Sequence, residues 1–303
     1  MVLYGKYRGS RKEISVKDWV EKVGGKRIYH RIINPLVVSY FGSSKNISSL
    51  YLTSRWRSES SVINKLGYIN LYYFLKKIEK ILVKRNVVIY TNKEIVKIVR
   101  KNNKYILFSS DNSIFKVDYL ISTIPPPVLN NIFHNDVLKS HLNNICYRSC
   151  ISLIINTYEK SSEYYWIINL ERKYNLITVF EYSNLCKNID GGLIYGVKYV
   201  DKNSKLYNSS NSTLKKIFLK EIYNLMENME YNKIIDFRII KIHYATPIYF
   251  TNYKNPPIKT KLKNLYLAGV YRKFPQIRSM GPALESGYEA ACLVTKKLEK
   301  NTL

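Results

Sequence analysis

The segment near the C-terminus contains the residues whose types and spacing best suit a ligand. It reads NLYLAGVYRKFPQIRSMGPALESGYEAACL and predicts a short buried strand from Leu265 to Ala268, a loop, and a helix whose first turn includes Ser279, Gly281 and Pro282. Proline has no amide hydrogen to leave unpaired there, and glycine lets a ligand approach the backbone. Such a helix start stabilises partial negative charge. An ordinary capped helix in a packing unit remains an alternative interpretation.

Other elements must position this segment, and several precede it in the chain. Ser15 and Asp18 form a possible capping box for a helix that reaches Val23 and ends at Gly24-Gly25. A second helical stretch is predicted over 27–40, and the Phe41-Gly42 pair breaks it. The sequence from Gly67 to Leu82 predicts an amphipathic helix. Short strands are then expected at 87–90, 95–99, 105–108, 114–117 and 118–124, the last closed by Pro125-Pro126-Pro127.

The middle of the chain has a different pattern. Alternating apolar residues predict strands at 150–157, 165–169, 175–182 and 193–199, a helix over 212–229, and strands at 234–240 and 243–245. The pentapeptide from Ala245 to Tyr249 then ends a strand with a proline beside a tyrosine.

The order and spacing of these elements resemble the flavin-containing amine oxidase superfamily, which includes protoporphyrinogen oxidases and phytoene-desaturase-like enzymes. The resemblance rests on the C-terminal segment, on T-x-P-P-P after a strand, and on A-x-P-x-Y at 245–249. It implies an FAD-dependent oxidoreductase that removes a hydride equivalent from an apolar small-molecule substrate. The cofactor-binding residues that it implies are Ile95, Thr123, Pro125, Gly269, Val270, Ser279, Met280, Gly281 and Ala283.

The resemblance also implies a substrate cavity and a domain organisation. Trp56, Pro247, Tyr249 and Arg278 would line the cavity. The expected fold is α/β of mixed α+β type, an incomplete FAD-binding domain with a mixed-sheet and helical substrate domain. Its expected parts are residues 1–66 (helical part of the substrate domain), 67–145 (FAD-domain segment), 146–256 (mixed-sheet substrate domain) and 257–303 (closing FAD-binding strand-loop-helix).

The sequence departs from the superfamily at three places. No G-x-G-x-x-G turn is present, although the family uses one to bind the pyrophosphate. Asn70-Leu71-Tyr72 stands where relatives have an acidic residue and two glycines, and Val270 stands where many have Asp. Three hypotheses remain: a flavoenzyme completed by a separate chain with the G-x-G-x-x-G unit, a truncated inactive remnant, or a basic protein that binds nucleic acid or another polyanion.

Composition limits the remaining functions. The 303 residues carry a formal charge of +27, but the lysines are dispersed and no RNA-binding signature accompanies them, so no nucleic-acid partner is expected. No apolar run reaches ~18 residues and no signal peptide is evident, which predicts a cytoplasmic protein without a membrane-spanning segment. The cysteines lack metal-ligand spacing and are expected to be buried free thiols. His30 and His243 could shuttle protons or serve only as packing or surface residues.

Overall fold

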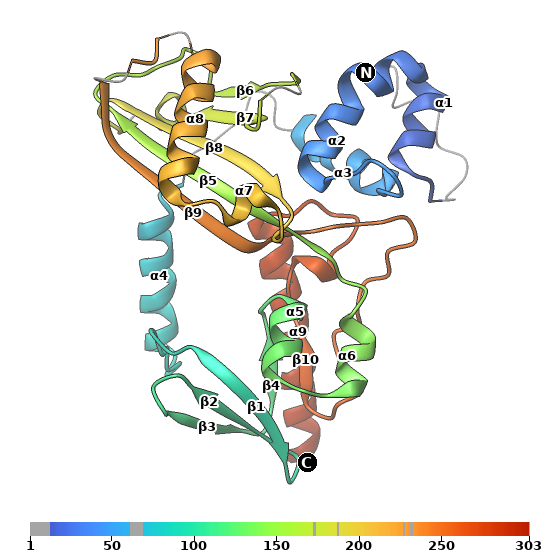
Figure 1. Ribbon diagram of the computed structural model, residues 1–303. Helices are drawn as coiled ribbons and strands as arrows, with labels where there is room; N and C mark the ends of the chain where they lie inside the picture. The colour runs from blue at the N-terminus through green and yellow to red at the C-terminus, as the bar shows by residue number, and fades with distance from the viewer. Residues whose placement is uncertain are drawn as a thin grey trace. The chain divides into compact units, whose positions relative to one another are not determined.

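The computed structural model describes residues 13–60, 69–171, 174–186, 188–226, 228–230 and 233–302. The chain divides into two compact units, each built from two separate stretches (Figure 1). Unit 1 comprises Met1–Leu66 and Cys146–Tyr253, and unit 2 comprises Gly67–Ile145 and Lys254–Leu303. The predicted helix start at Gly67 lies outside the described residues.

Unit 1 contains a five-stranded antiparallel sheet of order β6-β7-β8-β5-β9. Its elements are β5 (Tyr147–Thr157), β6 (Trp166–Ile168), β7 (Thr178–Glu181), η3 (Tyr182–Asn184), β8 (Gly192–Val200), α7 (Lys205–Asn208), α8 (Asn211–Leu225) and β9 (Ile234–Pro247). The long strand β5 pairs along its length with β8 on one side and β9 on the other. The strands and the covering helix predicted for this region are thus confirmed, with shorter bounds for β6, β7 and α8, except that the two strands predicted at 234–240 and 243–245 are one continuous strand, β9.

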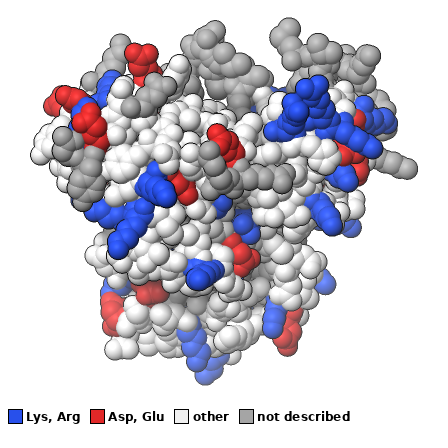
Figure 2. Space-filling model, turned by 45° about the horizontal axis from the view of Figure 1, so that its top comes forward, with Lys and Arg blue, Asp and Glu red and all other residues white. Residues whose placement is uncertain are grey.

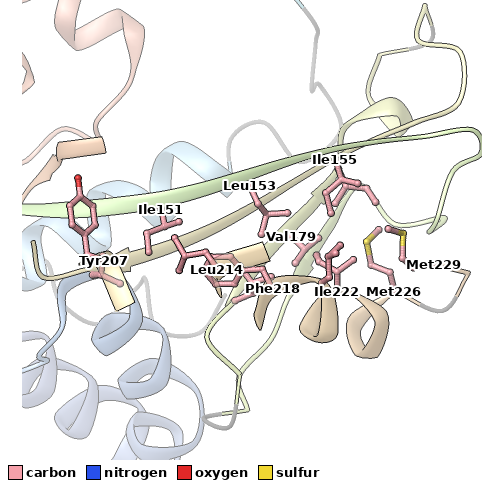
Figure 3. Close-up of a cluster of buried hydrophobic side chains, with 14 residues drawn as sticks. Ile151, Leu153, Ile155, Val179, Tyr207, Leu214, Phe218, Ile222, Met226 and Met229 are labelled. Carbon is pink, nitrogen blue, oxygen red and sulfur yellow. The ribbon is translucent and has the colours of Figure 1, made fainter. Parts of the chain in front are cut away.

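The core of the sheet lies between β5 and α8 (Figure 3). Alternate residues of β5 point to the helix because successive side chains of a strand face opposite sides. Residues four apart on α8 form the matching stripe. These side chains are fully buried: Ile151, Leu153 and Ile155 from β5, and Leu214, Phe218 and Ile222 from α8. Burial of each such side chain stabilises the fold by about 2 kcal/mol.

The helical part of unit 1 consists of α1 (Val16–Ile28), the π-helix η2 (Tyr29–Ile33), α2 (Asn34–Phe41) and α3 (Ser49–Ser60). The predicted cap is confirmed, because the Asp18 amide donates to Ser15 Oγ at 3.1 Å. The predicted helix end at Gly24-Gly25 is confirmed, because Gly25 is non-helical, with φ 82° and ψ 161°, and separates two helical pieces within the bounds of α1. Gly42, at φ 79°, ends α2 as predicted, since glycine adopts the left-handed conformation without steric cost.

Unit 2 combines a meander with a parallel strand pair. Its elements are α4 (Leu71–Lys84), β1 (Ile95–Lys101), β2 (Lys104–Ser109), β3 (Ile114–Val117), β4 (Leu120–Ser122), α5 (Pro126–Ile132), α6 (Asp136–Leu142), β10 (Leu265–Leu267), η5 (Val270–Arg272) and α9 (Met280–Thr302). β1, β2 and β3 form an antiparallel sheet, and β4 pairs with β10 in parallel. β4 and β10 confirm the strands predicted around them.

One predicted strand of unit 2 is absent. Residues 87–90 have no strand conformation, and Val87, Val88, Ile89 and Tyr90 are all exposed. The apolar run has the composition of a strand, but a strand needs a neighbour for its backbone hydrogen bonds. Among the described residues, none pairs with this run in a sheet. The preceding helix α4 also has no buried residue.

Candidate functional site

The candidate site begins at the carboxyl ends of the parallel strands β4 and β10. Ser122 and Leu267 are paired in register, and the Ala268 amide donates to the Ser122 carbonyl at 2.9 Å. Thr123 and Gly269, which follow these paired residues, therefore leave the sheet at the same edge. Ligands of open α/β sheets bind at this edge.

The loop after β10 is shaped by Gly269. Its φ of 147° disfavours other residues, and an added Cβ would lie 2.6 Å from the Tyr271 ring. The Gly269 amide donates to Ser286 Oγ at 2.9 Å, which ties the loop to the second turn of α9. Val270 begins the 3-10 turn η5 directly after it. The loop is thus held against the helix that follows it.

Arg272 provides the second connection between this loop and α9. Its Nε donates to the Pro256 carbonyl at 2.9 Å, and its Nη1 donates to the Leu267 carbonyl and to Ser286 Oγ, both at 3.3 Å. Burial lowers the pKa of Arg272 below its ordinary value. Because its donors are directed at protein carbonyls, Arg272 is a positioning residue for the loop.

The next residue, Lys273, extends this connection. Its ammonium lies 3.0 Å from a carboxylate oxygen of Glu285 and 3.0 Å from one of Glu289, both on α9. The hydrogen bond from Lys273 lowers the pKa of Glu285. These contacts hold α9 against the loop that contains Lys273.

The first turn of α9 is exposed to solvent. Met280, Gly281 and Ala283 are exposed, and in the described part of the chain no atom apart from the adjacent residues and the helix's own backbone lies within 4 Å of where a Cβ on Gly281 would be. The turn contains no acidic residue that would neutralise the helix dipole. Ser279 precedes the helix and accepts the Ala283 amide on its carbonyl at 3.4 Å. The arrangement offers room and positive potential for an electron-rich group.

The structure brings most of the predicted cofactor-binding residues together. Gly269 and Val270 lie in the loop that α9 holds, Ser279 to Ala283 form the start of that helix, and Thr123 lies at the same sheet edge as Gly269. Pro125 is the N-cap of α5, two residues later. Ile95 is elsewhere, at the start of β1 in the antiparallel sheet. Their role in cofactor binding stays a prediction.

The predicted cavity-lining residues belong to both units. Tyr249 is fully buried in unit 1, where its ring centroid lies 4.9 Å from those of Tyr51 and Tyr253. Trp56 packs against Trp19, also in unit 1, with centroids 5.7 Å apart. These aromatic residues are packing residues of unit 1, and a cavity-lining role for them stays a prediction.

Pro247 and Arg278 complete the predicted set. Pro247 is the buried last residue of β9 in unit 1, and Arg278 is an exposed residue of unit 2 shortly before α9. Their contact with a substrate likewise stays a prediction.

The histidines and cysteines do not form a catalytic cluster. His30 is 61% exposed on its side chain, and His243 in β9 contacts the rings of Tyr207 and Tyr244. Within the described ranges, no group of His, Cys, Asp or Glu could hold a metal ion. All the cysteines are free, but Cys146 is exposed, which corrects the expectation that every thiol is buried. Cys146 lies in the short connection between α6 and β5, outside either element.

A cavity inside unit 1 was not anticipated from the sequence. It has a volume of about 610 Å³, and two cationic residues, Arg148 of β5 and Lys198 of β8, contribute to its lining. A signal was present, because both residues are charged positions within otherwise largely apolar strands. Sequence alone could not show that these positions share a cavity.

The charged residues do not form one continuous basic face in the view of Figure 2. Lys and Arg side chains lie there in several separate groups with Asp and Glu among them. A dispersed distribution is weaker support for polyanion binding than a continuous stripe. Among the described residues, no helix is long and apolar enough to cross a membrane.

The sequence matches one family model over residues 10–295, described as flavin containing amine oxidoreductase. No curated protein sequence matches the chain.

Solved structures resemble it in fold. A putative protoporphyrinogen oxidase from Exiguobacterium sp. 255-15 is similar at a TM-score of 0.73 and 14% identity, over 98% of this chain and 70% of that one. A reduced UDP-galactopyranose mutase has a TM-score of 0.66 and 14% identity, over 88% of this chain and 63% of its own. An oxidoreductase from Methanosarcina mazei has a TM-score of 0.66 and 12% identity, over 92% and 69%. The chain thus spans only about two thirds of the length of these proteins.

Proposed function

Because the chain belongs to the family of flavin-containing amine oxidoreductases, we propose that it is the substrate-binding and flavin-closing part of an FAD-dependent oxidoreductase. The observation that carries this proposal is the first turn of α9. Met280, Gly281 and Ala283 are exposed there, whereas the loop behind the helix is fixed by Ser286 and Arg272. A rigid helix start with open backbone suits the electron-rich edge of a flavin ring.

The residues present fit such a cofactor. An atom approaching Gly281 meets no side chain at that position, and the turn carries no carboxylate to repel negative charge. Gly269 and Thr123, at the carboxyl edge of the parallel strands, would lie along the same cofactor. The FAD-binding residues we propose are therefore Thr123, Pro125, Gly269, Val270, Ser279, Met280, Gly281 and Ala283, with Ile95 at the adenine end.

When bound, a flavin would supply the redox chemistry by accepting a hydride equivalent from a substrate carbon. The protein would bind and orient an apolar substrate and hold the cofactor in place. The amides at the start of α9 would stabilise negative charge on the reduced ring. Within the described residues no metal-ligand cluster competes with this interpretation.

The surface of unit 2 supports a further polypeptide in the complete enzyme. On α4 the exposed apolar side chains include Leu71, Tyr73, Leu75 and Val83, each at least 53% exposed. The run 87–90, also exposed and apolar, follows this helix. A helix with a strongly apolar face normally buries that face. We propose that a G-x-G-x-x-G unit, absent from this sequence, covers α4 and pairs with residues 87–90.

The parallel strands β4 and β10 favour the same proposal. They form a two-stranded sheet by themselves, whereas parallel strands usually belong to larger sheets with both faces covered. An added βαβ unit would supply further parallel strands and the pyrophosphate site. The exposed side chains of Leu71 and Tyr72, where relatives have glycines, are the main structural difficulty for FAD at that position.

The experiment is to co-express this chain with a polypeptide encoded by a neighbouring gene, chosen for a G-x-G-x-x-G turn, and to record the visible spectrum of the purified material. Bound flavin in the complex, with a spectrum that substrate-like amines or porphyrinogens bleach, is the expected result. Absence of flavin from both the single chain and the complex would contradict the proposal and favour a truncated, inactive remnant.

An interface variant and a matched control test whether the flavin depends on the proposed partner. A Leu75→Glu, Val83→Glu variant should lose the partner and the colour together, because two carboxylates would be placed in the proposed interface. Equivalent changes on the exposed residues Lys205 and Lys216 of unit 1 should leave both intact. Retention of nucleic acid that decreases steeply with salt would instead favour a polyanion-binding protein.

A further inference from the structure

A cavity within unit 1 is lined by two partly buried cations, Arg148 and Lys198, and by two exposed acidic residues, Glu171 and Asp201. It lies beside the residues of α2 and the final residues of β8, and its volume is about 610 Å³. Volumes of this size are typical of sites for small organic ligands. All of its lining residues belong to unit 1, and none of them is among the residues proposed above for flavin.

Arg148 is the first cation of this cavity. Its side chain is only 15% exposed, and its nearest carboxylate oxygen, on Asp201, is 4.0 Å from Nη1. Its Nε is buried and has no hydrogen-bond partner in the described part of the chain. Asp201 is itself 64% exposed, so water screens the attraction. A buried donor without a partner is energetically costly and suits an added acceptor.

Lys198 is the second cation. Among the described residues no carboxylate lies within ion-pairing distance of its ammonium, although Glu221 is near enough to interact electrostatically. Burial lowers the pKa of Lys198, the carboxylate of Glu221 opposes this effect in part, and the positive charge of Arg148 lowers the pKa further. The two cations are thus close enough to repel each other, and an anion between them would relieve this repulsion.

The rest of the lining is suited to an apolar group. Pro35 and Val38 come from α2, and Val200 and Leu206 lie at the end of β8 and in α7. The acidic residues of the lining, Glu171 and Asp201, are exposed, whereas the cations are half-buried. The two cations are therefore less hydrated than the two carboxylates.

We propose that this cavity binds an organic carboxylate whose anionic group lies between Arg148 and Lys198 and whose apolar part contacts Pro35 and Val38. A guanidinium binds a carboxylate through two parallel hydrogen bonds, and the ammonium supplies a second positive charge. Phosphate alone would satisfy the charges but would leave the apolar walls without a partner.

The test measures binding of 4-phenylbutyrate, of its neutral amide 4-phenylbutyramide, and of inorganic phosphate to the full chain by calorimetry at low salt. We expect the carboxylate to bind about tenfold more tightly than the amide, since the amide lacks the charge-assisted hydrogen bonds. Equal affinity of the carboxylate and the amide would overturn the proposal, as would no binding of either. If inorganic phosphate bound as tightly as 4-phenylbutyrate, the apolar walls would contribute no affinity. That result would overturn the proposal that the ligand is organic.

Variants locate the site. Arg148→Gln and Lys198→Gln should each weaken carboxylate binding about tenfold, because each removes a charged donor. Arg148→Lys should recover part of the affinity, since it keeps the charge but loses the planar fork. Lys205→Gln, an exposed residue of α7 outside the lining, should bind as the unchanged protein does; equal loss in this control would indicate diffuse surface attraction and overturn the assignment.

Thermal unfolding without ligand separates binding from folding. Lys198 has no ion pair among the described residues, so Lys198→Gln should remain folded even if Arg148→Gln does not. Undiminished binding to folded Lys198→Gln would therefore contradict the proposed placement of the anion.

Discussion

The guanidinium of Arg148 occupies the space that a side chain on Gly42 would need. A Cβ at Gly42 would lie 2.7 Å from Arg148 Nη1, and the glycine is also in the left-handed conformation, at φ 79°. Because Gly42, which ends α2, has no side chain, the guanidinium of Arg148 can occupy this position beside the helix.

Gly42→Ala should destabilise unit 1 through both effects. The left-handed conformation costs alanine about 1 kcal/mol, and displacement of Arg148 adds to this cost. The matched control is Gly42→Ala in an Arg148→Ala background, where the same conformational cost remains but the guanidinium that an added Cβ would meet is absent. Urea unfolding should give a larger loss for Gly42→Ala; equal losses would show that the arginine moves aside without cost.

Lys198→Met should stabilise the protein by about 1 kcal/mol at neutral pH, because it removes a partly buried charge without an ion pair among the described residues. The pKa of Lys198 is lowered in the folded state, so the unfolded state binds its proton more tightly. The free-energy penalty of the charged Lys198 is therefore present below its pKa in the folded state. It disappears as the pH rises towards the ordinary pKa of lysine. The stability difference between the proteins, measured by urea unfolding, should shrink accordingly; a difference that grows with pH would contradict this account.

Glu221→Gln should destabilise unit 1 by about 1–3 kcal/mol, since the amide group cannot accept every hydrogen bond that the carboxylate accepts. Glu221 accepts the backbone amides of Asn175 and Leu176 at 2.9 and 2.7 Å and the Asn175 side chain at 2.7 Å. Glu230→Gln, which breaks an exposed ion pair with Lys233, is the control and should cost less than about 0.5 kcal/mol. Similar changes in melting temperature for both variants would show that the buried network is not important.

Gly281→Val should abolish flavin binding to the assembled enzyme with little change in stability. In the described chain no atom apart from the adjacent residues and the helix's own backbone lies within 4 Å of the position of the added Cβ, so the effect on the chain itself is limited to helix propensity, below about 1 kcal/mol. Gly287→Val is the control, because Gly287 also faces open space but lies further along α9. Bound flavin retained by Gly281→Val would show that the helix start does not contact the cofactor.

Local signals in the sequence predicted several elements correctly. The Ser15 and Asp18 pair identified the start of α1, and the glycine after Phe41 identified the end of α2. Both predictions depend on hydrogen bonds within one turn of the chain, which the sequence contains in full. The strand β10 was likewise predictable from a short apolar run between polar residues.

Features that depend on distant partners were not predictable in the same way. Residues 87–90 have the composition of a strand but lack a neighbouring strand in the described chain. Arg148 and Lys198 meet only because β5 and β8 pair, which no local pattern reveals. The candidate site is an intermediate case, since its glycine loop was predictable but the Arg272 connections behind it were not.

The pairing of β4 with β10 joins segments that a ribosome makes far apart in time. At a synthesis rate of about 5–20 residues per second, β4 emerges on the order of ten seconds before β10 exists. During that interval its open edge could join another nascent polypeptide. Slower translation should therefore lengthen the interval in which the edge of β4 has no partner strand.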